Sequence, residues 1–186
     1  MNYSKFISKA KQFAKGKLGH LNPRKVVAES YMRQLNREEF INPPFNKPNE
    51  RPIEYRFVFE QLAELYPKKI LDVGTGMTTL PNLMANCGFS VTAIDNITDY
   101  WRNGMFNRHY YVLDDSIVNP KIKDKFNLIT CISTLEHIEE YDQAVKSMFN
   151  LLGSGGHLVL TFPYSENKFV DNVYILPGSS VGKVKS

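Results

Sequence analysis

The chain has 186 residues, of which 42% are hydrophobic and 23% charged, and its formal net charge is +4. This length allows one domain with a substantial core and an appendage, and the composition is that of an ordinary soluble globular protein. No stretch approaches the roughly 18 consecutive apolar residues of a membrane span, and the amino terminus lacks a secretory signal pattern, so we expect a cytoplasmic location. Cys87 and Cys131 have no metal-binding spacing and are expected to be core thiols.

The positive charge is concentrated near the amino terminus. Residues 1–25 carry seven basic and no acidic side chains, so this segment is +7 and the remaining chain, by difference from +4, is −3. Apolar residues of segment 3–18 recur at helical spacing, which predicts a basic amphipathic helix. Packing of this helix on its own domain or on a second subunit is favoured over peripheral contact with an anionic membrane. Nucleic acid is a less favoured partner, because large apolar residues form a continuous stripe.

A second helix is predicted over residues 26–40, with Val27, Tyr31, Leu35 and Phe40 facing inward. Segment 42–52 has four prolines in eleven residues, which is incompatible with a continuous helix or a central strand. We therefore predict a basic helical extension with a proline-rich linker over residues 1–52, followed by a cofactor-binding domain over residues 53–186.

From residue 53 onward, helical and strand patterns alternate along the chain. Helices are predicted over residues 54–66, 78–86 and 139–152, and strands over residues 69–73, 90–94, 109–113, 126–132 and 157–162. The connections between strands are crossovers and not tight hairpins, which favours a parallel sheet. The predicted fold is therefore α/β, with a doubly wound, mostly parallel, Rossmann-like sheet and an amino-terminal helical extension.

Acidic residues end three successive predicted strands, at Asp72, Asp95 and Asp115. The carboxyl ends of parallel strands share one rim of a sheet, and ligands bind there. Gly74 and Gly76 follow the first strand and permit a tight turn that a ligand can approach closely. Asp95 lies 23 residues after Asp72, near the offset at which an acid binds ribose hydroxyls in dinucleotide folds. Position and charge therefore predict a bound nucleoside without a 2′-phosphate.

Five motifs, in order at the predicted strand ends, together resemble those of the class I S-adenosylmethionine-dependent methyltransferases. They are Ile70–Gly76, Val91–Asp95, Val112–Ile117, Phe126–Ile138 with its Leu-Glu-His continuation, and the glycine-rich Leu151–Leu160. The resemblance covers about residues 53–165. It implies S-adenosyl-L-methionine as cofactor and a small-molecule, sugar or lipid-linked methyl acceptor. Two positions depart from the family pattern, with Thr78 in place of a third glycine and Asn127 in place of an acid.

The resemblance also implies a set of cofactor-binding residues and no metal site. These are Asp72, Gly74, Thr75, Gly76, Asp95, Asn96, Asp115, Ser116 and Ser133. The glycine turn, with Asp72 beneath it, would hold the amino-acid part of the cofactor, and Asp95 would bind the ribose hydroxyls. Asn96 or Ile97 would lie beside the adenine. Asp115 would accept a hydrogen bond from the adenine amino group. The Ser116 amide would lie near the ring, and Ser133 would line the site near the sulfonium.

Methyl transfer makes few demands on side chains, because the sulfonium is already activated and the protein mainly aligns the nucleophile with the methyl group. An alcohol or amine acceptor also requires a base in some reactions. The candidates are His137 and His109, with Glu136 further back. For His137 a capping or packing role is favoured.

Aromatic residues gather between the second and third predicted strands, at Tyr100, Trp101 and within residues 105–111. Two interpretations are open: a hydrophobic cover over the sheet edge, or part of an acceptor or adenine wall. We favour the cover.

Methyltransferases of this class usually add two further strands after the one predicted at residues 157–162. Here only residues 169–186 follow the next loop, with one short strand candidate at Val173–Leu176. The fifth strand would then be an exposed apolar edge, which is an aggregation hazard. We therefore predict a truncated chain, or a partner that covers this edge. A non-catalytic binding or scaffold module stays an alternative function, and an NAD-dependent oxidoreductase is a less favoured one.

Overall fold

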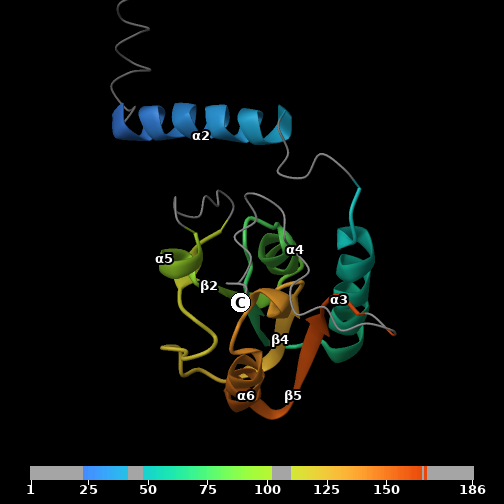
Figure 1. Cartoon of the computed structure of the whole chain (residues 1–186). Helices are drawn as coiled ribbons and strands as arrows, with labels where there is room; N and C mark the ends of the chain where they lie inside the picture. Colours follow the sequence, from blue (N-terminus) through green and yellow to red (C-terminus); the bar gives the residue numbers. More distant parts are fainter. Residues whose placement is uncertain (1–22, 42–47, 102–109, 165, 167–186) are drawn as a thin grey trace, which may run out of the picture. The chain divides into compact units, whose positions relative to one another are not determined.

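The computed structural model of the chain describes residues 23–41, 48–101, 110–164 and 166, and the chain divides into two compact units, residues 1–46 and 47–186. The first unit contains helix α2 (Pro23–Ile41), which begins three residues before the predicted helix because proline is well tolerated in a first helical turn (Figure 1). Val27 and Tyr31 were expected to face inward and are 68% and 53% exposed, so that prediction is wrong. The helix predicted over residues 3–18 lies outside the described residues, so its membrane contact or self-association stays a prediction.

The second unit alternates helices and strands around one parallel sheet. Its elements are α3 (Arg51–Leu65), β1 (Lys69–Val73), α4 (Leu80–Asn86), β2 (Ser90–Asp95), α5 (Ile97–Tyr100), β3 (Val112–Asp114), β4 (Phe126–Ile132), the 3-10 helix η1 (Leu135–His137), α6 (Tyr141–Leu151) and β5 (Leu152–Thr161). The five strands are ordered β3-β2-β1-β4-β5, and every neighbouring pair is parallel. The predicted doubly wound α/β fold is confirmed.

Each face of the sheet is covered by its own helices, because successive residues of a buried strand point to opposite faces. Ile70 of β1 and Leu128 of β4 belong to a core cluster with residues of α3 and α4. Leu71 of β1 and Ile129 of β4 belong to a second cluster with residues of α6. These two fully buried layers fix the strand ends, and with them the rim that carries the candidate site.

The element boundaries differ from the predicted ones in a few places. Helix α3 begins at Arg51, inside the predicted linker, because a proline in the first turn is compatible with a helix. Strand β3 begins at Val112, three residues late, and the short helices α5 and η1 were not predicted. Strand β5 begins at Leu152, ahead of the predicted glycine turn. Residues 153–156 lie in an irregularity of the β4–β5 pairing, between the pairs Phe126–Leu152 and Leu128–His157, and a Cβ at Gly156 would lie 3.0 Å from the Phe126 carbonyl.

The two cysteines have different environments. Cys131 is buried in β4, as expected, whereas Cys87 is exposed at the end of α4, which contradicts the predicted core role. The helix ends there, and Gly88, directly after Cys87, adopts φ +93, a conformation that commonly follows the end of a helix.

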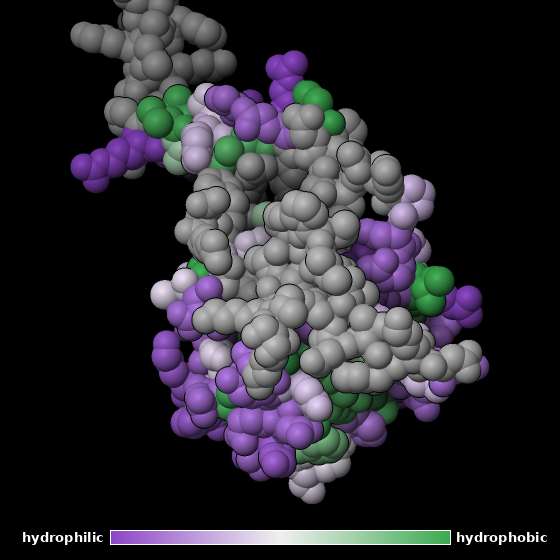
Figure 2. Space-filling model, in the orientation of Figure 1, coloured by the Kyte–Doolittle hydropathy of each residue, from purple (hydrophilic) through white to green (hydrophobic). Residues whose placement is uncertain are grey.

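Strand β5 lies at one edge of the described sheet. Figure 2 shows hydrophobic surface at the lower edge of the domain in the region of β5, and hydrophilic surface around α6 and the loop that precedes β4. In the described part of the chain, no helix is both long and apolar enough to cross a membrane.

Candidate functional site

The glycine turn after β1 is held between the end of β2 and the residues that follow β4. The amides of Gly74 and Thr75 donate to the Ile94 carbonyl at 2.9 and 3.4 Å. The Thr134 hydroxyl donates to the Gly74 carbonyl at 3.0 Å. Gly74 has φ +66, and a Cβ there would lie 2.6 Å from the Thr134 Oγ1 atom, so only glycine fits. Gly76, with φ +55, then directs its backbone amide toward β2.

Asp95 connects the end of β2 to this turn. Its side chain is buried, with 8% of the residue exposed. Its Oδ2 atom accepts from the Gly76 amide at 2.7 Å, and its Oδ1 atom accepts from the Trp101 indole at 3.0 Å. Burial raises the pKa of this carboxyl, although the Gly76, Trp101 and Asn96 donors lower it. Ribose hydroxyls are donors that these two carboxylate oxygens can accept. The donor and acceptor set therefore fits a nucleoside.

Asp72 lies beneath the turn and does not reach the rim surface. It is 2% exposed, and its Oδ1 atom accepts from the Thr130 hydroxyl of β4 at 2.5 Å. Burial raises the pKa of Asp72 to about 6, against the lowering effect of the Thr130 and Thr75 hydroxyls. The carboxyl therefore lies beneath the turn and is bonded to β4, and its part in holding the amino-acid moiety of the cofactor stays a prediction. Thr75 is also buried, and its hydroxyl lies 2.9 Å from the Tyr110 hydroxyl.

Asp115 is buried and faces its own loop. Its carboxylate accepts from the backbone amides of Lys121 and Ile122 at 2.9 to 3.1 Å. Its own amide donates to the Asp95 carbonyl at 3.0 Å, which ties the loop to the end of β2. Asp115 was expected to accept a hydrogen bond from an adenine amino group. These two backbone amides already donate to its carboxylate and would compete with that amino group. Ser116 is half-buried in the turn that follows.

The neighbouring Asp114 holds the start of α5, a role that the sequence did not indicate. Its Oδ1 atom accepts from the amides of Ile97 and Thr98 at 2.9 and 3.2 Å, and its Oδ2 atom accepts from the Thr98 hydroxyl. These donors lower the pKa of Asp114. Asn96 and Ile97, both half-buried, are thereby kept beside Asp95, where an adenine was expected.

A polar network beyond β4 and β5 joins residues far apart in sequence. Ser133 adopts φ +45, and its hydroxyl donates to Glu54 Oε1 at 2.5 Å. The Thr161 hydroxyl donates to the same oxygen at 2.7 Å, and Arg51 forms an ion pair with Glu54 Oε2 at 2.7 Å. Ser133 directly follows β4, but its side chain is bonded to α3, and its predicted place near the sulfonium stays a prediction. Neither Arg51 nor Glu54 was predicted, since nothing in the local sequence distinguishes them from ordinary helix residues.

The base candidates lie on or near η1. Both carboxylate oxygens of Glu136 are buried, and neither has a hydrogen-bond partner among the described residues. Burial raises the pKa of Glu136, and burial together with the Arg51 charge lowers the pKa of His137. Both groups are therefore shifted toward their neutral forms. His109 lies outside the described residues.

Asn127, which replaces an acid of the family pattern, keeps a structural contact. Its Oδ1 atom accepts from the Lys69 amide at 2.9 Å, so the amide side chain still joins the starts of β1 and β4. Within the described ranges, no group of three or more His, Cys, Asp or Glu side chains is arranged to hold a metal ion.

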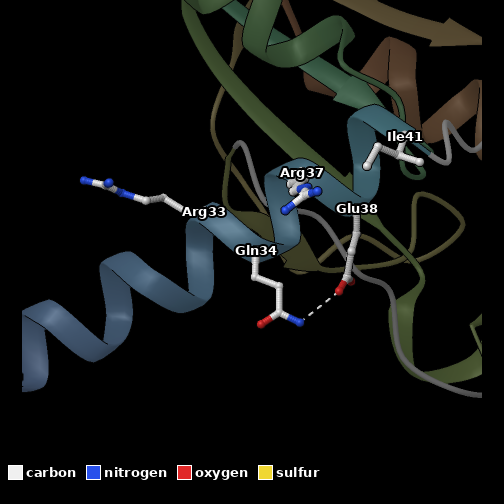
Figure 3. A pocket seen from close by; sticks show the side chains of 5 residues that line it. All are labelled: Arg33, Gln34, Arg37, Glu38 and Ile41. Atoms are coloured by element: carbon white, nitrogen blue, oxygen red, sulfur yellow. Dashed lines mark hydrogen bonds between the residues drawn. The ribbon is translucent and has the colours of Figure 1, made fainter.

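A separate hollow of about 520 Å³ lies on the first unit (Figure 3). Its lining residues are Arg33, Gln34, Arg37, Glu38 and Ile41, all from α2. The Gln34 amide donates to Glu38 at 3.0 Å across one helical turn. Among the described residues, only side chains of this one helix line the hollow, and no strand-end residue is among them. The rim of the sheet therefore remains the candidate site.

A family model described as a methyltransferase domain matches residues 48–177. The chain belongs to this family. The family membership that the strand-end motifs predicted is thus confirmed.

Individual relatives agree with this assignment. The ubiquinone biosynthesis O-methyltransferase of Glaesserella parasuis is 30% identical over 121 residues, which cover 59% of this chain and 51% of the relative. The enzyme of the same name from Coxiella burnetii is 28% identical over 135 residues, covering 69% and 56%. The chain thus spans about half the length of the curated relatives it matches.

Among solved structures, the N-methyltransferase NodS from Bradyrhizobium japonicum, in complex with S-adenosyl-l-homocysteine, is 21% identical. The TM-score is 0.51, with 69% of this chain and 71% of that chain covered. This likeness shows the shared fold.

Proposed function

We propose that this chain is an S-adenosylmethionine-dependent methyltransferase that modifies a hydroxyl group of a small-molecule, sugar or lipid-linked acceptor. The observation that carries the proposal is the buried Asp95 carboxylate at the end of β2, bonded to the glycine turn of β1. Membership of the methyltransferase domain family supports the type of reaction. The names of the O-methyltransferase relatives support a hydroxyl as the methylated group.

The sheet topology supports the same position for the ligand. In the order β3-β2-β1-β4-β5, the connections run in opposite directions on the two sides of the β1–β4 pair. In open α/β sheets, ligands bind outside the carboxyl ends of the strands at such a switch point. The glycine turn follows β1 and Ser133 follows β4, so both flank this point, and Asp95 lies one strand away.

When bound, the cofactor would supply an electrophilic methyl carbon, which a lone pair of the acceptor oxygen attacks as the sulfur–carbon bond breaks. Asp95 would hold the ribose, and the turn at Gly74 and Gly76 would allow close approach of the amino-acid part. The proton of the acceptor hydroxyl must then leave. Glu136 is our first candidate to take it, because its two oxygens are buried and bond to none of the described residues. His137, with a lowered pKa and hence a neutral ring, is the second.

Calorimetric titration with S-adenosylhomocysteine tests the cofactor assignment. The wild-type chain should bind it, and Asp95→Ala should weaken binding by about 10- to 100-fold, the effect of losing hydrogen bonds to a charged group. The matched control is Asp99→Ala, which removes the same charge from an exposed position on α5. Circular dichroism should show that both variants are folded. Absence of binding to the wild-type chain would overturn the proposal.

Two other functions are separated from methyl transfer by the same measurements. A non-catalytic binding or scaffold module would bind the sulfur nucleoside but methylate no acceptor in an assay with phenolic, sugar and lipid-linked hydroxyl compounds. An NAD-dependent oxidoreductase would bind NAD in place of the sulfur nucleoside, and the family assignment argues against it.

A further inference from the structure

Trp101 lies against both parts of the proposed nucleoside site. It follows α5, and its backbone amide closes that short helix by donating to the Ile97 carbonyl at 3.2 Å. Its indole nitrogen donates to Asp95 Oδ1 at 3.0 Å. A ring carbon, Cζ2, lies 3.7 Å from the position that a Cβ would occupy on Gly76. One side chain thus contacts the ribose-binding carboxylate and also covers the glycine turn.

The hydrogen bonds that Asp95 accepts from Gly76 and from Trp101 differ in how easily they can be exchanged. The Gly76 amide belongs to the backbone of a turn whose preceding residues, Gly74 and Thr75, are bonded to β2, so it cannot leave Oδ2 without disrupting the turn. The Trp101 indole reaches Oδ1 through two rotatable side-chain bonds, so it can leave while the backbone stays in place. Because a buried carboxylate needs donors, the indole can leave only if another donor takes its position.

We propose that Trp101 is a latch on the nucleoside site, in which the indole N–H bonds Asp95 and is exchanged for a ribose hydroxyl when the cofactor binds. This inference rests on the proposed function. The latch keeps Asp95 hydrogen-bonded at every stage, because one donor replaces another. It also makes Trp101 a specificity-determining residue, since a ligand without a hydroxyl at this position provides no donor to replace the indole.

The exchange predicts a particular effect of removing the indole N–H. Trp101→Phe keeps an aromatic ring over the turn but leaves Asp95 Oδ1 without its side-chain donor. In the variant the ribose hydroxyl would bind an oxygen that has already lost its indole donor, whereas in the wild-type chain it must displace that donor. A hydrogen bond to a charged group is involved, so affinity for S-adenosylhomocysteine should increase about tenfold. A residue that merely builds the site would show the opposite change, a loss of affinity.

Trp101 is the chain's single tryptophan, so its fluorescence reports on the latch directly. S-adenosylhomocysteine should change the emission of the full-length wild-type chain with the same dissociation constant as calorimetry gives. Calorimetry should also show about tenfold tighter binding to Trp101→Phe. The matched control, Tyr111→Phe, removes a hydroxyl from a side chain that is 81% exposed and should leave both the affinity and the emission change unaltered.

The possible results are distinguishable. Binding of S-adenosylhomocysteine without an emission change, or equal or weaker binding by Trp101→Phe, would overturn the latch and leave the proposed function standing. No binding by either protein would overturn the proposed function and this inference together. Binding by Trp101→Phe alone would support both, and would mean that the indole competes too strongly in the wild-type chain at the concentrations used. Circular dichroism of each variant establishes that a loss of binding is not a loss of fold.

Discussion

Asp72 should make the stability of the folded chain depend on pH between about pH 4 and pH 7. Burial in β1 raises the pKa of its carboxyl from 3.8 to about 6. Between these values the folded state holds the proton more tightly than the unfolded state does, so the free energy of unfolding falls as the pH rises. At 1.36 kcal/mol per pKa unit, the full loss is about 3 kcal/mol. The contribution is fully present below pH 3.8 and is lost as the pH rises through about 6.

The isosteric variant Asp72→Asn isolates this contribution, because it cannot titrate and still offers an oxygen to the Thr130 hydroxyl. Urea unfolding of both proteins, followed by far-ultraviolet circular dichroism, gives the free energy of unfolding at each pH. The value for the wild-type chain minus that for the variant should fall by about 2–3 kcal/mol from pH 4 to pH 7 and then level off. A flat or rising difference would refute the argument from burial. Thr130→Val removes a donor to the ionised carboxylate, so it should cost more stability at pH 7 than at pH 4.

Two further predictions concern the turn and the thiols. Gly74→Ala should cost about 2–5 kcal/mol of unfolding free energy, because the residue has φ +66 and its Cβ would overlap the Thr134 side chain. The control is Gly155→Ala, because Gly155 has φ +70 but a Cβ there would lie in open space. This variant should lose only about 1–2 kcal/mol of unfolding free energy in the same denaturation experiment. Equal losses in the two variants would contradict the overlap with Thr134. In the folded chain an alkylating reagent should modify the exposed Cys87 and spare Cys131, because Cys131 is buried and burial raises the pKa of its thiol. The intact mass should therefore show one adduct on the folded chain and two adducts only after unfolding.

The sequence predicted the sheet well because its signals were local. Short apolar runs separated by helical patterns define β1, β2 and β4, and these strands lie within one residue of the predicted limits. Boundaries were less accurate where a local signal had two structural solutions. The glycines at residues 153–156 read as a turn, yet they lie within β5, where a Cβ at Gly156 would crowd the Phe126 carbonyl.

The candidate site was predictable in position but not in the orientation of its side chains. A strand end places an acid on the rim, and Asp95 and Asp115 both lie there. Which way each carboxylate turns depends on donors elsewhere in the chain, and for Asp115 these are backbone amides six and seven residues later. Glu54 was not found at all, because its partners Ser133 and Thr161 lie 79 and 107 residues away. No local pattern encodes such pairs.

For Trp101, the sequence indicated an aromatic cluster but not the polar contact of the indole. A hydrophobic cover over the sheet edge was the favoured interpretation, and it stays a prediction because residues 102–109 lie outside the described residues. The hydrogen bond from its indole to Asp95 gives it a polar contact that a hydrophobic cover does not require. That contact is decided by the geometry of α5, a four-residue helix that the sequence did not predict.

The four acids at the ends of the first three strands differ in the groups that donate hydrogen bonds to them. Asp72 is bonded to a hydroxyl of the neighbouring strand, and Asp115 to the backbone of its own loop. Asp114 is bonded to the start of α5. All of these partners are part of the fold, so releasing the carboxylates would cost stability. Asp95 alone among these four has a bond from a long aromatic side chain that can rotate away. Ligand exchange should therefore take place at Asp95, while Asp114 and Asp115 hold the loops at the rim and Asp72 joins β1 to β4 beneath it.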